Sequence, residues 1–200
     1  MADQCTVYSD NATTILLAGV GGQGTILAAD LLAKTAMANG LEVKLSEIHG
    51  MSQRGGAVTT VVRIGEKVNS MVCCEGCADY LLSFETTEAL RNIQYLKKGG
   101  MLLVNDESIK PLPVLTGKAT MAENINGRLE GFDAHLVPAT YLARRAGSPK
   151  CANVVLLGAL AAGLPFTVES WQEQIKAKVP PKTIDMNLVA FQSGLDCIQA

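Results

Sequence analysis

The sequence contains few of the residues on which nucleic-acid-binding and membrane proteins depend. Aromatic residues make up 4% of the 200 residues, and the formal net charge is −2. Neither base-stacking side chains nor a basic surface is therefore expected. The most apolar region, residues 154–166, is shorter than the ~20 residues that a membrane-spanning helix needs. We predict no nucleic-acid partner and no membrane segment.

Charged residues are also scarce, at 18%, whereas hydrophobic residues reach 48%. This balance is typical of a globular chain with a large core, and the length suits a single domain. Residues 1–13 are polar and without periodicity, so we expect a flexible tail followed by one domain over residues 14–200. The first apolar run, residues 15–20, is short and has no basic leader, which predicts a cytoplasmic protein without a signal peptide.

The six cysteines of such a protein are expected to be free thiols. Cys73, Cys74 and Cys77 lie close together in the sequence and are compatible with half a metal site or with a redox pair. The other three cysteines are scattered, and a complete site needs two more ligands at suitable spacing. We therefore predict structural thiols and no metal site, and a redox role for these three residues stays open.

A glycine-rich segment follows the first predicted strand. Residues 14–18 are continuously apolar, as in a strand buried on both faces, and residues 25–39 have helical spacing. The residues between them match the pattern G-x-G-x-x-G at Gly19, Gly21 and Gly24. In this pattern the glycines allow a tight turn and a close backbone approach, so the segment predicts a Rossmann-like first turn.

Alternating strand and helix patterns continue along the chain. Further strands are predicted at 41–48, 57–64, 79–84, 101–105 and 132–138, and helices at 85–96, 140–146, 153–163, 168–178 and 184–198. Thr86 or Thr87 is expected to cap the first of these helices. Residues 67–72 are expected to return as a hairpin partner of the strand before them. The alternation predicts an α/β fold, with a doubly wound, mostly parallel sheet in a single domain.

One interpretation of the glycine-rich turn is a site for a nicotinamide dinucleotide. The helix start offers unpaired N–H groups to a phosphate. Glu47 lies 23 residues after Gly24, near the position where such domains carry their ribose-binding acid. However, a glycine-rich turn also serves simply to pack a helix on a strand, and the residues after Glu47 do not follow a dinucleotide pattern. Phosphate binding by the turn, and a freestanding NAD(P)-binding protein, therefore remain alternatives.

The second candidate site is the segment Ser46-Glu47-Ile48-His49-Gly50-Met51-Ser52-Gln53-Arg54-Gly55-Gly56, between two predicted strands. Its glycines permit backbone conformations from which the polar side chains point outward. Arg54 suits a carboxylate or a phosphate, because a guanidinium binds their oxygens bidentately, or it pairs with Glu47. His49 is expected to orient a polar group, to bond across a subunit interface or to bond a neighbouring carbonyl. Gln23, in the glycine-rich turn, is expected to cap the adjacent helix or to face a partner.

Both segments, with Val62-Arg63-Ile64-Gly65, resemble the beta subunits of indolepyruvate:ferredoxin oxidoreductases. These subunits are similar to the gamma domain of other 2-oxoacid:ferredoxin oxidoreductases. The resemblance covers nearly the whole chain after the first dozen residues and continues at Tyr141, Ala143, Asn153 to Gly158, Asn187, Ala190, Phe191 and Gly194. The string His-Gly-Met-Ser-Gln-Arg-Gly-Gly favours the indolepyruvate branch, with the pyruvate and 2-oxoisovalerate branches as alternatives.

The resemblance implies a subunit that is inactive alone and completes an active site. The complex oxidatively decarboxylates aryl 2-oxoacids to acyl-CoA, with CoA as co-substrate and electrons passing to ferredoxin. Thiamine diphosphate and 4Fe–4S clusters belong to the large alpha subunit, so this chain is expected to hold no cofactor and no certain catalytic residue. An isolated chain is expected to hide its interface in a homodimer. The implied site residues are Gly19, Gly21, Gly22, Gln23 and Gly24 in the turn, and Glu47, His49, Gly50, Met51, Ser52, Gln53, Arg54, Gly55 and Gly56 in the loop.

Overall fold

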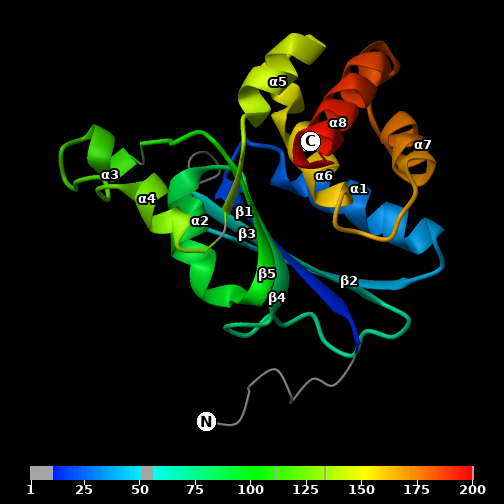
Figure 1. Cartoon of the computed structure of the whole chain (residues 1–200), viewed down its shortest axis with the longest axis horizontal. Coiled ribbons are helices and arrows are strands. Elements are labelled where there is room, and N and C mark those ends of the chain that lie inside the picture. Colours follow the sequence, from blue (N-terminus) through cyan, green and yellow to red (C-terminus); the bar gives the residue numbers. More distant parts are fainter. Residues whose placement is uncertain (1–10, 51–55, 111, 133, 200) are drawn as a thin grey trace.

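The computed structural model describes residues 11–50, 56–110, 112–132 and 134–199. Within these residues, six strands form one sheet in the order β2-β3-β1-β4-β5-β6, and helices cover both of its faces (Figure 1). The pairs β1–β4, β4–β5 and β5–β6 are parallel, whereas β3 is antiparallel to β1 and to β2. The predicted α/β fold with a doubly wound, mostly parallel sheet is confirmed. The predicted tail stays a prediction, since its first ten residues lie outside the described part.

Most elements agree with the predicted ranges, but β5 begins at Leu96 and not at residue 101, and α3 and α4 were not predicted. The strands are β1 (Thr13–Val20), β2 (Glu42–His49), β3 (Ala57–Gly65), β4 (Ala78–Ser83), β5 (Leu96–Asn105) and β6 (Ala134–Val137). The longer helices are α1 (Thr25–Ala38), α2 (Thr86–Asn92), α5 (Ala139–Ala146), α6 (Ala152–Ala161), α7 (Val168–Lys178) and α8 (Ile184–Gln199). The short helical segments are η2 (Ile93–Tyr95), α3 (Leu112–Leu115), α4 (Ile125–Glu130), η3 (Pro149–Cys151) and η4 (Pro181–Thr183).

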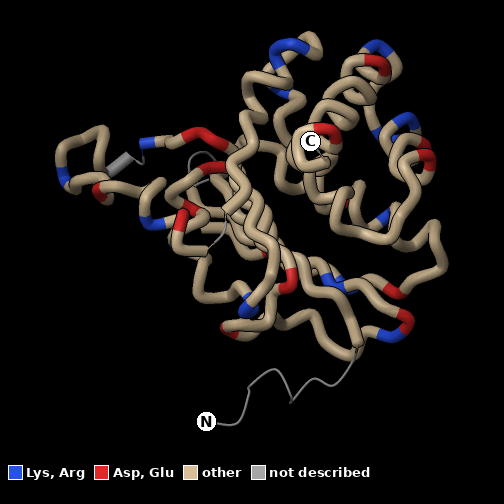
Figure 2. The backbone as a smooth tube through the Cα atoms, in the orientation of Figure 1, with Lys and Arg blue, Asp and Glu red and all other residues tan. Residues whose placement is uncertain are grey.

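The apolar run of β1 is continuous because helices bury both faces of this strand, as its sequence suggested. Ile15 and Leu17 contribute to a large core with α1, α5, α6, α7 and α8. Leu16 and Ala18 point to the other face, into a smaller core with α2 and α4. All four side chains are at most 1% exposed. Both signs of charge lie mainly on the outer helices and loops (Figure 2).

The position of β3 makes the strand order of this sheet different from that of a dinucleotide-binding domain, in which β2 lies directly beside β1. Here β3 lies between them, and its eight register pairs with β1 run from Thr13–Ile64 to Val20–Ala57. Glu47, on β2, pairs with Thr60 of β3. It is therefore one strand further from β1 than a ribose-binding acid would be.

Two local predictions are wrong. Residues 67–72 form no strand; instead, Val68 N donates to the Glu42 carboxylate and the Arg63 guanidinium donates to Ser70 O. Side chains rather than a strand ladder thus hold this segment. The helix after β4 begins at the predicted place, but its N-cap is Glu85 and not a threonine. The carboxylate of Glu85 accepts the N–H groups that a threonine hydroxyl was expected to accept.

The cysteine prediction is confirmed in part. Cys73, Cys74, Cys151 and Cys197 are free thiols. Cys77 is disulfide-bonded, so the prediction is wrong there, because spacing in the sequence does not show which thiols folding brings together. Burial raises the pKa of the Cys73 thiol to about 11, so this thiol stays protonated near neutral pH and is a weak nucleophile.

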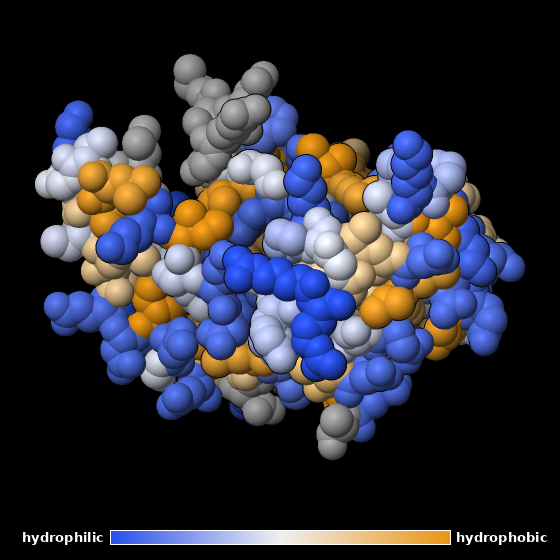
Figure 3. All heavy atoms as spheres, turned by 90° about the horizontal axis from the view of Figure 1, so that it is seen from above, coloured by the Kyte–Doolittle hydropathy of each residue, from blue (hydrophilic) through white to orange (hydrophobic). Residues whose placement is uncertain are grey.

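No described helix combines the length and the apolar character needed to span a bilayer. The upper face of the molecule, over α5 and α8, mixes hydrophilic and apolar side chains in small patches (Figure 3). This mixture is ordinary for a water-exposed surface.

Helices α6 and α8 cross at two glycines. A Cβ added to Gly194 would lie 1.8 Å from Val155 O, and one added to Gly158 would lie 2.0 Å from Phe191 O. The backbones of the two helices are therefore in direct contact. Trp171 packs beside this crossing, with its ring centroid 5.9 Å from that of Phe191.

We predict that Gly194→Ala destabilises the chain by about 3 kcal/mol, because the added methyl group forces the two helices apart. For a chain of this size the melting temperature should fall by roughly 6–12 °C. Alanine by itself favours a helix over glycine, so a loss of stability reports the clash. The control is Ser193→Ala on the same helix, and equal melting temperatures for the two variants would contradict the prediction.

Candidate functional site

The carboxyl ends of β1 and β2 border a cleft of about 570 Å³. The glycine-rich turn, residues 19–24, and the start of α1 form one wall, and the end of β2 forms the other. The lining residues are Gly21, Gly22, Gly24, Thr25, Ile26, Glu47, His49, Gly50 and Val58. The structure thus brings together the two segments that the sequence singled out.

Glu47 and His49 both line the cleft because alternate residues of a strand share a face. They pair with Thr60 and Val58 of β3. Glu47 is half-buried, whereas His49 is exposed. Ile26 is 62% exposed on the opposite wall. The cleft therefore offers one carboxylate, one imidazole and an apolar side chain.

The middle of the predicted loop, Met51, Ser52, Gln53, Arg54 and Gly55, lies outside the described residues, and the roles of these residues stay predictions. Both ends of the loop are anchored by backbone hydrogen bonds. Gly50 N donates to Ala57 O at 3.1 Å, and Gly21 N donates to Gly56 O at 2.9 Å. The second bond joins the loop directly to the glycine-rich turn.

Of the two roles expected for Gln23, a helix cap or contact with a partner, the structure contradicts the first. Its Oε1 accepts from Val20 N at 2.8 Å, and its Nε2 donates to Phe84 O at 3.1 Å. The N-cap of α1 is Gly24, with a φ of 82° and no side-chain hydrogen bond to the helix. The predicted helix cap is therefore wrong, because both polar atoms of Gln23 are engaged by the backbone of β1 and by the residue after β4.

Gly24 is held by a second side chain, that of Asn153 at the start of α6. The Asn153 Nδ2 donates to Gly24 O at 3.2 Å, and Asn153 is 4% exposed. A Cβ on Gly24 would lie 2.5 Å from this nitrogen. Glycine is thus required at this position both for its left-handed backbone and for the approach of Asn153.

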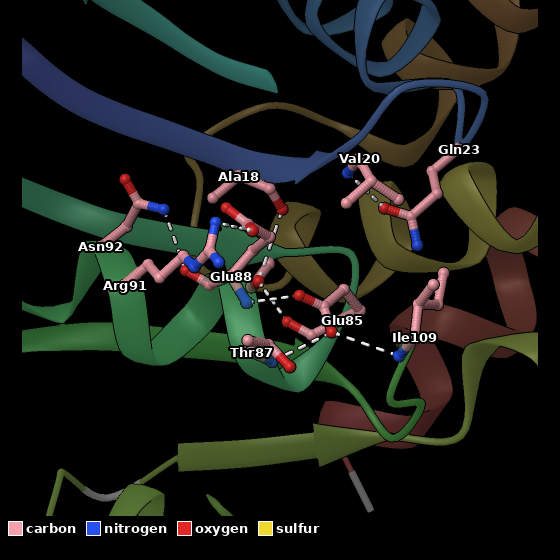
Figure 4. Close-up of polar contacts among 10 residues, drawn as sticks. Ala18, Val20, Gln23, Glu85, Thr87, Glu88, Arg91, Asn92 and Ile109 are labelled. Atoms are coloured by element: carbon pink, nitrogen blue, oxygen red, sulfur yellow. Dashed lines mark hydrogen bonds and ion pairs between the residues drawn. The ribbon is translucent and has the colours of Figure 1, made fainter. Parts of the chain in front are cut away.

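A buried carboxylate, that of Glu85, lies at the start of α2 (Figure 4), and the sequence reasoning missed it. Glu85 is 1% exposed and caps α2 by accepting from Thr87 N at 3.0 Å and from Glu88 N. It also accepts from Ile109 N at 3.4 Å. An acid directly after a buried parallel strand was the available signal, since its side chain falls at the carboxyl edge of the sheet.

The neighbouring Glu88 is also buried. Desolvation raises the pKa of Glu88; Arg91, 3.1 Å away, opposes the rise, and Glu85 adds to it. Glu85 and Glu88 do not line the cleft, and their contacts cap and stabilise α2. We therefore assign them to the framework and not to the candidate site.

A second hollow, of about 480 Å³, lies at the amino end of β1 and β4. Its charged residues include Asp79 and Lys97, which form an ion pair at 3.1 Å. Asp79 also accepts from Thr14 N at 2.9 Å. Cys74 and Cys77 also line this hollow. None of the described residues predicted for the glycine-rich turn or the loop does, so the cleft at the carboxyl ends remains the candidate site.

Part of the glycine-rich turn is engaged in hydrogen bonds within the chain. The N–H groups of Val20, Gly21 and Gln23 all donate within the chain. Among the residues that the structure describes, no three His, Cys, Asp or Glu side chains gather as metal ligands. The cleft is open and rimmed by residues of both walls, which suits contact with a ligand or a surface that another molecule also contacts.

Comparisons with known proteins identify sequences and structures that resemble this chain. A family model described as pyruvate ferredoxin/flavodoxin oxidoreductase matches residues 14–197. The indolepyruvate oxidoreductase subunit IorB of Thermococcus kodakarensis is 45% identical over 193 aligned residues, covering 90% of this chain and 93% of IorB. The 2-oxoglutarate synthase subunit KorC of Methanothermobacter thermautotrophicus is 35% identical, covering 92% of this chain and 94% of KorC. A keto/oxoacid ferredoxin oxidoreductase gamma subunit from Geobacter sulfurreducens has a TM-score of 0.69 at 27% identity, covering 94% of this chain and 98% of its own.

We predict that Asn153→Ala lowers the free energy of unfolding by about 1–2 kcal/mol, because it removes the hydrogen bond to Gly24 O inside a packed site. Amide exchange should speed up in the first turn of α1. Urea unfolding and exchange measured by NMR test both effects, with the exposed Asn126→Ala on α4 as the control. Unchanged exchange at residues 24–28 would show that Asn153 does not hold the turn.

Proposed function

The chain belongs to the pyruvate ferredoxin/flavodoxin oxidoreductase family, and from this premise we propose that it is the beta subunit of an indolepyruvate:ferredoxin oxidoreductase. The complex oxidatively decarboxylates aryl 2-oxoacids, transfers the acyl group to CoA and passes the electrons to ferredoxin. The larger alpha subunit holds the thiamine diphosphate and the iron–sulfur clusters. The present chain completes the active site and is inactive alone.

The observation that carries the proposal is the cleft itself. Its two walls are the glycine-rich turn and the end of β2, which leads into the loop after His49. Ile26, on the wall that the turn and the start of α1 form, is 62% exposed. An exposed apolar side chain beside an open polar cleft fits a surface that a partner covers. The docked alpha subunit then closes the cleft over the 2-oxoacid or CoA.

The alternatives differ in substrate or in class. The gamma subunit of another 2-oxoacid oxidoreductase is the nearer one, given the similarity to KorC. The higher identity to IorB, at 45% against 35%, favours indolepyruvate. A freestanding NAD(P)-binding protein is disfavoured, because β3 separates β1 from β2 and the N–H groups of Val20, Gly21 and Gln23 donate within the chain.

Co-expression with the large subunit tests the proposal. The purified complex should reduce ferredoxin in a reaction that requires CoA, and indolepyruvate and phenylpyruvate should be better substrates than pyruvate. A preference for pyruvate would favour the other branch. A gain in thermal stability of the isolated chain with NAD(H) or NADP(H), without complex formation, would favour the nicotinamide alternative.

We predict that Arg54→Ala leaves assembly intact and lowers kcat/KM of the complex by roughly 10- to 100-fold, the loss expected for one charge-assisted hydrogen bond to an anionic ligand. Steady-state assays with the 2-oxoacid and with CoA varied in turn identify which of the two ligands it contacts. The control is Arg144→Ala, an exposed arginine at the end of α5. Wild-type kinetics in a normally assembled Arg54 variant would remove the loop from the active site.

A further inference from the structure

The carbonyl oxygen of Phe84 is a junction between segments that are far apart in the sequence. It accepts from Gln23 Nε2 at 3.1 Å and from Asn105 Nδ2 at 3.3 Å. Phe84 N donates to Ala18 O at 2.8 Å. Asn105 Oδ1 in turn accepts from Ala139 N, at the start of α5, at 3.1 Å. The ends of β1, β4 and β5 are thus tied together at this residue.

This junction lies at a topological switch point of the sheet. Helix α1 follows β1 and packs on one face, whereas α2 follows β4 and packs on the other. In doubly wound sheets such a crevice, outside the carboxyl ends of adjacent strands, is where ligands bind. Here the amide of Gln23 spans it. Gln23 Oε1 accepts from Val20 N (Figure 4), and Gln23 Nε2 donates to Phe84 O.

The turn is built around this side chain. A Cβ added to Gly19 would lie 2.7 Å from Gln23 Oε1 and 2.9 Å from Phe84 Cβ. Glycine at position 19 therefore leaves the space that the Gln23 amide fills. The side chain of Gln23 is half-buried and does not line the cleft.

We propose that Gln23 is a positioning residue that sets the spacing between the two walls of the cleft. Its amide fixes the turn to the end of β4. The turn then holds the far end of the loop through the hydrogen bond from Gly21 N to Gly56 O, at 2.9 Å. Gly56 precedes Ala57, whose carbonyl accepts from Gly50 N at the near end of the loop. One side chain outside the cleft thereby controls the relative position of residues 21–26 and 47–50.

The inference rests on the proposed function only for its catalytic consequence, since the positioning itself concerns the chain alone. Gln23→Leu keeps a side chain of similar size and removes both hydrogen bonds. Gln23→Glu keeps an acceptor for Val20 N and can donate to Phe84 O only when its carboxyl group is protonated. Gln94→Ala, at an exposed glutamine far from the turn in sequence, is the control.

The first measurement is amide exchange in the full-length chain. Gln23→Leu should speed exchange at Gly21 and at Gly50 at least about tenfold relative to Gln94→Ala, because one broken hydrogen bond opens each site more often. In Gln23→Glu, exchange corrected for its intrinsic pH dependence should return toward the wild-type rate as the pH falls toward the pKa of the new carboxyl group. Exchange at both sites equal to that of the control would overturn the proposal.

The second measurement is steady-state kinetics of the assembled complex. Gln23→Leu should raise KM for the ligand that occupies the cleft, the 2-oxoacid or CoA, about tenfold, while kcat stays within about twofold, because displaced walls weaken binding more than chemistry. Faster exchange with both KM values unchanged would mean a purely structural residue and would also overturn the proposal. A wild-type complex without 2-oxoacid-dependent reduction would refute the proposed function, whereas the exchange result would still decide the role of Gln23 in positioning the turn.

Discussion

The structure depends on how closely helix α6 approaches its neighbours. Every residue from Asn153 to Ala161 is buried. At its start the helix contacts Gly24 through Asn153, and in its middle Gly158 meets the backbone of α8. Because neither contact leaves room for a Cβ, the start of α1 and the position of α8 are fixed together. The wall of the cleft at the glycine-rich turn is therefore set by the core of the protein.

Most of the fold was predictable because its signals are local. The apolar run of β1, the helical spacing of α1 and the amphipathic pattern of α7 each reflect burial on two faces or on one. The order of the strands was not predictable in this way. The insertion of β3 between β1 and β2 depends on antiparallel pairing between residues about 40–50 positions apart. The sequence of a strand does not show which strand it pairs with. The strand prediction for residues 67–72 was wrong for the same reason, because the contacts that hold this segment come from a buried arginine on β3 and a glutamate on β2.

The candidate site was predictable in its residues and less so in its contacts. Both segments stood out through glycines and polar side chains, and the structure joins them through Gly21 N and Gly56 O. A backbone hydrogen bond between two glycines cannot be predicted from the sequence, because no side chain takes part in it. Gln23 was assigned a local partner because caps act over three or four residues, whereas its donor atom bonds a carbonyl 61 residues away. Glu85 was missed because the search for a cap favoured the threonines beside it.

A glycine-rich turn can bind a phosphate or can pack a helix closely on a strand, and the two uses differ in what the backbone N–H groups of the turn bond. A phosphate cradle leaves its N–H groups free and aims them at the ligand. In this chain the N–H groups of Val20, Gly21 and Gln23 are occupied, and Gly19 and Gly24 allow close packing around Gln23 and Asn153. What remains accessible is the cleft side, with Glu47, His49 and an apolar rim. Because Gly21 N holds Gly56 O, the turn stays fixed relative to Glu47 and His49, so that both segments can contact the same ligand, and this supports the proposal that another subunit completes the site.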